Sequence, residues 1–362
     1  MPDTKPGIYF DENQVCGACI NADTKRNTDW SVKSKELENI CNNIRGSNGN
    51  GYECVVPVSG GKDSIYQAYI MSKVHNLKTL CVNISSHVQT FEGISNLNNL
   101  VEKLSLDLLR VNVRPSTQKK IRKIGLIDLG NPNYGEHYVV FAGVARAALN
   151  AKAPLVVWGE DIGREFGGNI SSTSSKMGSA EDLISNDLFN QVSLYDLLDG
   201  RISSNELFFY NHPTKEKIKA TNIKSIYLSH FYNWDGYEHY KFAKKLGFIE
   251  RKDGNLSGNI LNYDNIDEKL CEIHIWFKML KFGFWRPTDQ TCYQIWNSRM
   301  TREEAVDIVL EKQYEFPYEY LPEFLEYHEM KENELFEYME KWRNLDLWTK
   351  RNKKWVLQNE IS

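Results

Sequence analysis

Between residues 54 and 229 the chain alternates short apolar runs with segments of helical periodicity. Apolar runs rich in Val, Ile and Leu predict strands, while apolar residues spaced three and four apart predict helices. The predicted strands lie at residues 54–58, 79–84, 108–113, 154–158 and 225–229. The predicted helices lie at residues 64–74, 93–106, 116–127 and 137–151. Such alternation is typical of an α/β fold with a doubly wound parallel sheet, which is the fold class we predict.

The two ends of the chain follow other patterns. Residues 1–45 combine a short hairpin with a helix, and residues 236–362 are mostly helical, including the Trp-rich stretch that ends at Leu357. Residues 46–235 then form the α/β domain. Within it, residues 169–220 are rich in Ser, Thr and short polar loops, which indicates an insertion and a candidate lid.

The run Ser59-Gly60-Gly61-Lys62-Asp63-Ser64 follows the first predicted strand and opens the next predicted helix. A glycine turn at a helix N-terminus lets backbone N–H groups approach an anion, while Lys62 supplies positive charge and the two serines supply hydroxyl donors. It is not a Walker A loop, because Val56 stands where the first glycine is required. The run resembles the PP-loop of ATP pyrophosphatases, which split ATP into AMP and pyrophosphate. An ordinary strand–helix turn is the alternative.

Other polar residues also follow predicted strands, where ligands of doubly wound sheets bind. Asn83 and Ser85 come at the end of the second strand, at the place expected for adenosine. Gly159-Glu160-Asp161 follows the fourth strand, and Glu165 comes shortly after. Carboxylates there would hold Mg²⁺ against a polyphosphate or polarise a nucleophile. The alternative is a glycine-rich loop whose charges are only solvated.

Two further groups of residues have two interpretations each. Cys16 and Cys19 have the spacing of a zinc knuckle, but a structural zinc needs four ligands and no second Cys-x₂-Cys lies nearby, so free or redox-active thiols are the alternative. Arg286, Arg299 and Arg302 would form an anion pocket for a phosphorylated or carboxylated substrate. Surface ion pairs are the competing explanation for these arginines.

Composition narrows the class of protein. The chain has 362 residues, 41% of them hydrophobic, and a net charge of −4 with a pI of about 6.1, so nothing indicates general affinity for nucleic acid or for an anionic membrane. No apolar run has the length of a membrane span, and the N-terminus does not resemble a signal peptide. Seven scattered cysteines fit a reducing compartment. We therefore expect a cytoplasmic protein.

Taken together, these motifs resemble the N-acetyl sugar amidotransferases, a PP-loop family of bacterial surface-polysaccharide and nonulosonic-acid biosynthesis. The resemblance covers nearly the whole chain except residues 169–220. It rests on segments 2–8, 10–12, 15–19, 59–64, 158–161, 165–168, 232–235, 281–284 and 299–304. Relatives usually carry another Cys-x₂-Cys just upstream of the Met-Pro-Asp-Thr segment. The numbered chain does not contain that pair, which in relatives would make a four-cysteine zinc site together with the counterparts of Cys16 and Cys19.

The resemblance implies a PP-loop fold like that of adenine nucleotide α-hydrolases and an ATP-dependent reaction that converts an acetamido group of a nucleotide-linked or nonulosonic sugar to an acetamidino group. It implies the cofactors ATP, Mg²⁺ and, at the cysteines, Zn²⁺. The loop 59–64 would hold the polyphosphate with Lys62 as its main charge. Asp63, with Glu160 or Asp161, would bind Mg²⁺. Glu165 and the three arginines would face the sugar.

The resemblance also implies partners. Relatives take ammonia from a separate glutaminase, often with a cyclase-like subunit that channels it, and this chain shows no recognisable glutaminase. A homo-oligomer is compatible with the sequence. Two rival classes stay open: a PP-loop enzyme that thiolates or amidates a tRNA base, which the net charge of −4 disfavours, and a non-catalytic nucleotide-binding scaffold, which the intact loop disfavours.

Overall fold

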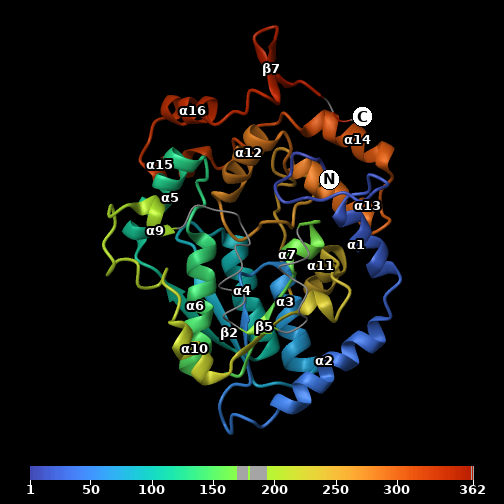
Figure 1. Cartoon of the computed structure of the whole chain (residues 1–362), viewed down its shortest axis with the longest axis vertical. Coiled ribbons are helices and arrows are strands. Elements are labelled where there is room, and N and C mark those ends of the chain that lie inside the picture. Colours follow the sequence, from blue (N-terminus) through green and yellow to red (C-terminus); the bar gives the residue numbers. More distant parts are fainter. Residues whose placement is uncertain (169–177, 180–193, 360, 362) are drawn as a thin grey trace.

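The structure, a computed structural model, describes residues 1–168, 178–179, 194–359 and 361. Its centre is a six-stranded sheet in the order β3-β2-β1-β4-β6-β5, in which five strands are parallel and β5 pairs antiparallel with β6 at one edge (Figure 1). The strands are β1 (Cys54–Pro57), β2 (Thr79–Ser85), β3 (Asp107–Asn112), β4 (Leu155–Trp158), β5 (Gly178–Ser179) and β6 (Lys224–Tyr227). The predicted parallel sheet is confirmed.

Helices cover both faces of this sheet because successive strand residues point to opposite sides. Val55, Val82 and Val156 belong to the cluster under α6, whereas Val56, Cys81 and Val157 belong to the larger cluster under α3 and α4. The helices of this part are α3 (Lys62–Tyr69), continued by a π-helical turn (Ile70–Val74), α4 (Phe91–Leu104), α5 (Pro115–Leu129), α6 (Glu136–Ala151), α7 (Ile162–Glu165), α9 (Leu194–Leu198) and α10 (Lys215–Thr221). The sheet is therefore doubly wound, as predicted.

The N-terminal segment begins with a small hairpin, closed by an antiparallel bridge between Phe10 and Cys16. Helix α1 (Gly17–Arg26) starts immediately after Cys16, and α2 (Trp30–Ile44) follows with Asp29 as its N-cap. Helix α1 packs against α7 and α13, and thus joins the N-terminal segment to both other parts of the chain (Figure 1).

The C-terminal region is helical over most of its length, and a separate apolar cluster includes most of its tryptophans: Trp276, Trp285, Trp342, Trp348 and Trp355. After a 3₁₀ turn (Leu228–His230) come α11 (Gly236–Lys245), α12 (Cys271–Phe282), α13 (Arg286–Trp296), α14 (Arg302–Lys312), α15 (Leu321–His328) and α16 (Glu332–Lys341). The prediction that the tail is helical to Leu357 is wrong at its end, where β7 (Trp348–Arg351) and β8 (Lys354–Leu357) form a hairpin. Asn352 and Lys353 both have positive φ, the conformation that a tight two-residue hairpin turn requires.

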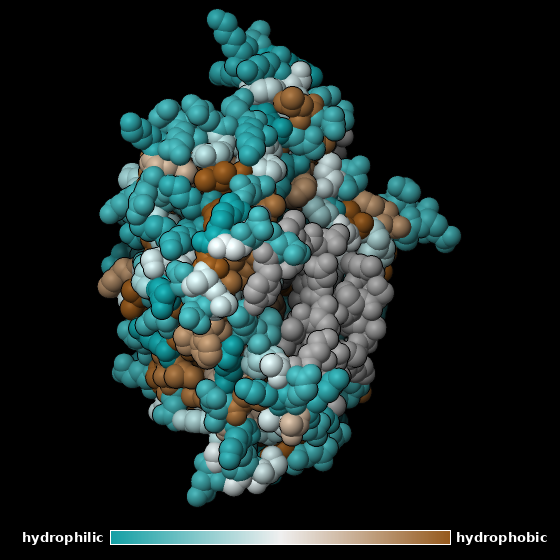
Figure 2. Space-filling model, turned by 60° about the vertical axis from the view of Figure 1, so that its left-hand side comes forward, coloured by the Kyte–Doolittle hydropathy of each residue, from teal (hydrophilic) through white to brown (hydrophobic). Residues whose placement is uncertain are grey.

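The predicted insertion at residues 169–220 falls partly outside the described residues. Its described part includes α9 and a segment to Tyr210, whose apolar side chains join a cluster with Ile121 on α5, Val139 on α6 and Tyr134 between these two helices. On the face seen in Figure 2, hydrophobic residues lie in small groups among hydrophilic ones. Within the described residues, no helix is both long and apolar enough to cross a membrane.

Candidate active site

The loop from Ser59 to Ser64 joins the end of β1 to α3, at the point where the strand order reverses between β1 and β4. This is the switch point at which doubly wound sheets bind ligands. Gly60 has φ of +96°, and a Cβ on it would collide with the carbonyl of Gly93, so that only glycine fits there. Ser59 Oγ accepts a hydrogen bond from Gly61 N at 3.2 Å, and Ser64 Oγ donates to Gly61 O at 2.9 Å. The loop is thereby held in one conformation by its own serines.

Lys62 is the one loop side chain with a positive charge, and two carboxylates hold it. Its Nζ lies 2.6 Å from Asp264 and 3.1 Å from Asp63, and it stands over the ring of Tyr263. Burial opposes the charge on Lys62, but the two carboxylates outweigh burial and hold its pKa well above the usual value. The Lys62 ammonium is therefore permanently charged. Phosphate oxygens could bind it together with the two carboxylates or in place of them.

Asp63 is fixed by a second contact, on its other oxygen. His239 Nδ1 lies 2.7 Å from Asp63 Oδ1, and the His239 ring stacks on Tyr66 with 4.1 Å between centroids. Burial would raise the pKa of Asp63, but Lys62 and the hydrogen bond from His239 hold it below the usual value. Asp63 is thus an ionised carboxylate at the start of α3.

A cavity of about 330 Å³ lies against this loop. One wall is the loop itself together with Glu160 and Glu165, which follow β4; the other is the C-terminal region, through the segment Leu261–Asp267 and helix α13. The carboxylates that line the cavity are Asp63, Glu160, Glu165, Asp264, Asp267 and Asp289. Burial, and then the charge of Asp63, raises the pKa of Glu160 to about 7, and burial raises the pKa of Asp267.

Helix α13 (Arg286–Trp296) separates this cavity from a second one. Its residues Asp289, Gln290 and Tyr293 line the phosphate-loop cavity, while Thr291, Cys292 and Ile295 line a larger, mainly apolar cavity of about 650 Å³ on the other side. The three-and-four spacing of these two sets places them on opposite faces of one helix. The polar face of α13 is thus the part that contributes to the phosphate-loop site.

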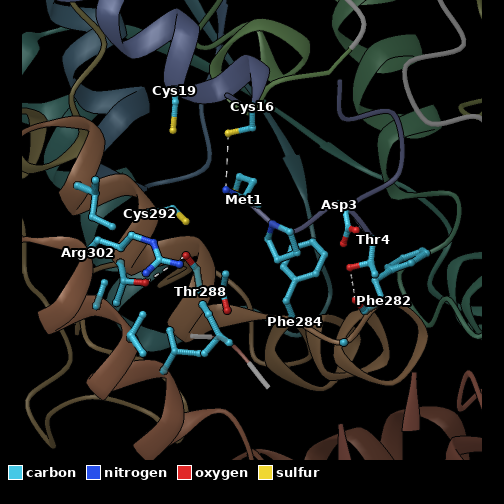
Figure 3. A pocket seen from close by; sticks show the side chains of 18 of the residues that line it. Met1, Asp3, Thr4, Cys16, Cys19, Phe282, Phe284, Thr288, Cys292 and Arg302 are labelled. Carbon is cyan, nitrogen blue, oxygen red and sulfur yellow. Dashed lines mark hydrogen bonds between the residues drawn. The ribbon is translucent and has the colours of Figure 1, made fainter. Parts of the chain in front are cut away.

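The larger cavity holds the cysteine pair (Figure 3). Cys16 and Cys19 lie on the side of α1, with Cys292 across from them and Arg302 further along the wall (Figure 3). A hydrogen bond with Cys19 lowers the pKa of Cys16 to about 5, against the effect of burial. In the described part of the chain, no group of three or more His, Cys, Asp or Glu residues is placed to hold a metal ion. The donors present therefore do not fit a four-ligand zinc site.

The three predicted arginines do not converge into one anion pocket, and this expectation requires correction. Arg286 lines the phosphate-loop cavity, but its guanidinium pairs with the buried Glu272 at 3.1 and 3.3 Å. Arg299 makes two 2.7 Å hydrogen bonds to Asp235. Arg302 lines the larger cavity, on the far side of α13. The sequence spacing could not show that a helix separates them.

Asp161 also lies away from the cavity. It is fully buried, accepts a hydrogen bond from Arg164 N at 3.2 Å as the N-cap of α7, and its other oxygen lies 3.0 Å from His230 Nε2. These contacts stabilise the turn after β4, and they leave neither oxygen of Asp161 facing the cavity as a ligand for Mg²⁺. The neighbouring Glu160 is the residue that lines the cavity.

The residues predicted to bind adenosine, Asn83 and Ser85, make hydrogen bonds within the protein. Asn83 Nδ2 donates to Val58 O at 2.8 Å and Ser85 Oγ donates to Asn83 Oδ1 at 2.8 Å, so that both brace the strand that leads into the phosphate loop. Gly159 packs against Trp234, where a Cβ would be tight at 3.0 Å. Ser85 lines a shallow cavity with Arg110 and Arg114 at the ends of β2 and β3.

Several residues of this site were not foreseen from the sequence. Asp264, Asp267 and Tyr293 reach the cavity from the C-terminal region, Lys25 reaches Glu165 from α1, and His239 reaches Asp63 from α11. The acidic cluster Asp264–Glu268 was the available signal, since it stands before a helix in an otherwise neutral stretch.

Residues 228–362, a little over a third of the chain, match the family described as "LPS biosynthesis protein WbpG-like, C-terminal domain". The uncharacterized protein MJ1599 of Methanocaldococcus jannaschii is 28% identical over 109 residues, which are 30% of this chain and 39% of that protein. The chain thus spans well under half the length of this relative.

Solved structures resemble the chain only distantly. The NH₃-dependent NAD synthetase from Campylobacter jejuni is 13% identical with a TM-score of 0.31, over 62% of this chain and 99% of that one. NMN synthetase from Francisella tularensis is 14% identical with a TM-score of 0.28, over 54% and 93%. The U34-tRNA thiolase NcsA from Methanococcus maripaludis is 12% identical with a TM-score of 0.29, over 61% and 82%. TM-scores this low do not establish a relationship.

The doubly wound sheet carries the Ser-Gly-Gly-Lys-Asp-Ser loop at its switch point, so the chain combines an α/β fold with a phosphate-binding loop that resembles the PP-loop. Its C-terminal region, residues 228–362, is similar to the WbpG-like C-terminal domains of LPS biosynthesis proteins. This domain supplies Asp264, Asp267 and the polar face of α13 to the cavity. The site is therefore built jointly by the loop and by the WbpG-like domain.

Proposed function

We propose that this protein is an ATP-dependent amidotransferase that converts an acetamido group of a nucleotide-linked or nonulosonic sugar to an acetamidino group. One observation carries the proposal: the loop Ser59–Ser64 and the WbpG-like domain enclose one cavity between them, which holds the charge of Lys62 and several carboxylates. A loop suited to polyphosphate thus faces a domain associated with LPS biosynthesis. The family resemblance supplies the acceptor class.

In the first step, the amide oxygen of the sugar attacks the α-phosphorus of ATP. The bond to the β-phosphate breaks, pyrophosphate leaves, and the amide N–H proton is lost, which gives an O-adenylyl imidate. Lys62 and the N–H groups at the start of α3 stabilise the charge that develops on the leaving pyrophosphate. This activation is needed because an amide oxygen is otherwise a poor leaving group.

The donors in the cavity suit Mg²⁺. Asp63 and Asp264 offer the carboxylate oxygens that this ion prefers, and Mg²⁺ is commonly held by one or two carboxylates together with substrate phosphates. When bound, the ion would neutralise phosphate charge that would otherwise be repelled by the carboxylate-rich wall. Asp63 is already ionised and oriented for this purpose by His239.

In the second step, ammonia adds to the imidate carbon, the carbon–oxygen bond breaks, and AMP leaves with the former amide oxygen. Ammonium must lose a proton before it can attack. Glu160, with a pKa raised to about 7 and a place in the cavity wall, is the base that fits this role near neutral pH. A separate glutaminase, with a cyclase-like subunit, would supply the ammonia.

The direct test is turnover by the purified chain with Mg-ATP, ammonium and a panel of acetamido sugars. We expect sugar-dependent AMP and pyrophosphate, and mass spectrometry should show replacement of an oxygen by NH in one sugar. Lys62→Met should abolish AMP formation, while Lys341→Met, which alters an exposed lysine of α16 far along the chain, should not.

The other outcomes separate the alternatives. AMP formed without any sugar product, but stimulated by tRNA, would overturn the proposal in favour of a tRNA-modifying enzyme. Binding of ATP with no AMP under any condition, even with a glutaminase added, would indicate a nucleotide-binding scaffold. Full turnover by Lys62→Met would show that the phosphate loop has been misassigned.

A further inference from the structure

A third cavity, of about 190 Å³, lies on the α1 side of the phosphate-loop cavity. Glu165 and Tyr293 line both cavities, so the two share a wall at these side chains. The remaining lining comes from α1, including Ala18, Ala22 and Lys25, from the end of α13 and the residues that follow it, and from Asn233 and Asp235. Its volume is too small for a sugar or a nucleotide, and its polar lining suits a small polar ligand.

The shared wall already binds an ammonium group, that of Lys25. Lys25 Nζ lies 2.7 Å from Glu165 Oε2 and 2.7 Å from the carbonyl oxygen of Trp234. The side chains of Lys25 and Glu165 are only 12% and 4% exposed. A carboxylate and a carbonyl at this distance are the ligands that free ammonium would use, because its N–H donors are the same as those of a lysine.

The other side chain that both cavities share, Tyr293, is held in place by its hydrogen bonds. The hydroxyl of Tyr293 accepts a hydrogen bond from Gly236 N at 3.1 Å and lies 3.4 Å from the carbonyl of Trp234. Asp235, which also lines the small cavity, is held by Arg299 through two 2.7 Å hydrogen bonds. Lys25 fills its place in the wall with an ammonium at the end of a long aliphatic chain, which is the group that a smaller cation could replace.

We propose that the small cavity under α1 is the ammonium entrance of the enzyme, and that Glu165 binds the incoming ammonium in exchange for Lys25. The proposal deepens the proposed function and rests on it for the identity of the ligand. Ammonium bound at Glu165 lies in the wall that the phosphate-loop cavity shares, beside the base Glu160. Transfer of one proton from ammonium to the Glu160 carboxylate then yields the ammonia that attacks.

Binding can be tested without turnover. Lys25→Ala removes the resident ammonium and leaves Glu165 buried without its partner, so the melting temperature should fall. Ammonium chloride should restore it more than sodium chloride at the same ionic strength, because free ammonium refills the site. The double variant Lys25→Ala with Glu165→Gln should lose this ammonium-specific rescue. Equal rescue by both salts, or rescue that persists in the double variant, would overturn the ammonium site.

Entry is tested by filling the cavity. Ala22→Met places a larger side chain in its wall, and Thr24→Met makes a similar change on the exposed side of the same helix. We expect Ala22→Met to raise the KM for ammonium about tenfold, with little change in the KM for ATP, and Thr24→Met to leave both unchanged. An unchanged KM for ammonium in a folded Ala22→Met would refute the entrance. A wild-type enzyme with no turnover on ammonium or with an added glutaminase would overturn the proposed function, and this entry route with it.

Discussion

Arg286 tests whether a buried arginine supports the fold or binds substrate. Its side chain and that of Glu272 are 9% and 3% exposed, and they form two hydrogen bonds of 3.1 and 3.3 Å. Arg286→Met removes the cation and leaves Glu272 with Asn259 as its remaining described donor, at 3.0 Å. Loss of one partner of a buried ion pair costs about 3–5 kcal/mol of unfolding free energy. That is a large share of the ~5–15 kcal/mol that stabilises a typical protein.

The assay is urea unfolding of Arg286→Met, Glu272→Leu and the double variant, which together form a double-mutant cycle. We expect the double variant to recover most of the stability, because an apolar pair no longer leaves a buried charge uncompensated. Lys119→Met is the control, since its pair with Glu329 is exposed and should contribute at most about 1 kcal/mol. If Arg286→Met loses less than about 1 kcal/mol while the KM for the sugar rises steeply, Arg286 is a substrate ligand and the structural argument is wrong.

Two further variants test the loop and the turn after β4. Gly60→Ala should lose ATP binding and more stability than Gly254→Ala; both glycines have φ near +90°, but only Gly60 meets a neighbouring carbonyl, so the difference in unfolding free energy measures that collision. Equal losses would contradict the close approach. Asp161→Ala should cost about 2–4 kcal/mol of stability, because α7 loses its cap and His230 its partner. The activity of Asp161→Ala should depend on Mg²⁺ concentration in the same way as that of the wild type. If the variant needs more Mg²⁺, Asp161 is a metal ligand after all.

The sheet was predictable because strands buried on both faces are written as continuous apolar runs, such as Cys54–Val58 and Leu155–Trp158. The phosphate loop was predictable because its conformation depends on its own residues, Gly60 and the two serines. Glu160 followed from the rule that ligands meet the carboxyl ends of strands. In each case the signal is local in the sequence.

The parts that failed depend on contacts between distant segments. Lys62 and Asp264 are 202 positions apart in the chain, and Lys25 and Glu165 are 140 apart. Charge patterns do not show which ion pairs form, so Arg286 and Arg302 looked equivalent although α13 places them in different cavities. The C-terminal hairpin was missed for a different reason. Two non-glycine residues adopt positive φ at its turn, and their intrinsic turn propensity does not indicate this conformation.

The pH dependence of the ammonia step would identify Glu160 as the base. The pKa of Glu160 is raised to about 7, first by burial and then by Asp63, so its carboxyl is mostly protonated below that pH and ionised above it. Since the base must be ionised to take a proton from ammonium, kcat/KM for ammonium should rise through pH 7.

Free ammonia also increases with pH, so wild type and Glu160→Gln must be compared over the same range. The variant should keep the slope that free ammonia produces, lose the inflection near pH 7, and fall in rate by about 10²–10⁴. An inflection that persists in Glu160→Gln would assign the base to another group, and a rate within about twofold of wild type would show that ammonia reaches the imidate already deprotonated.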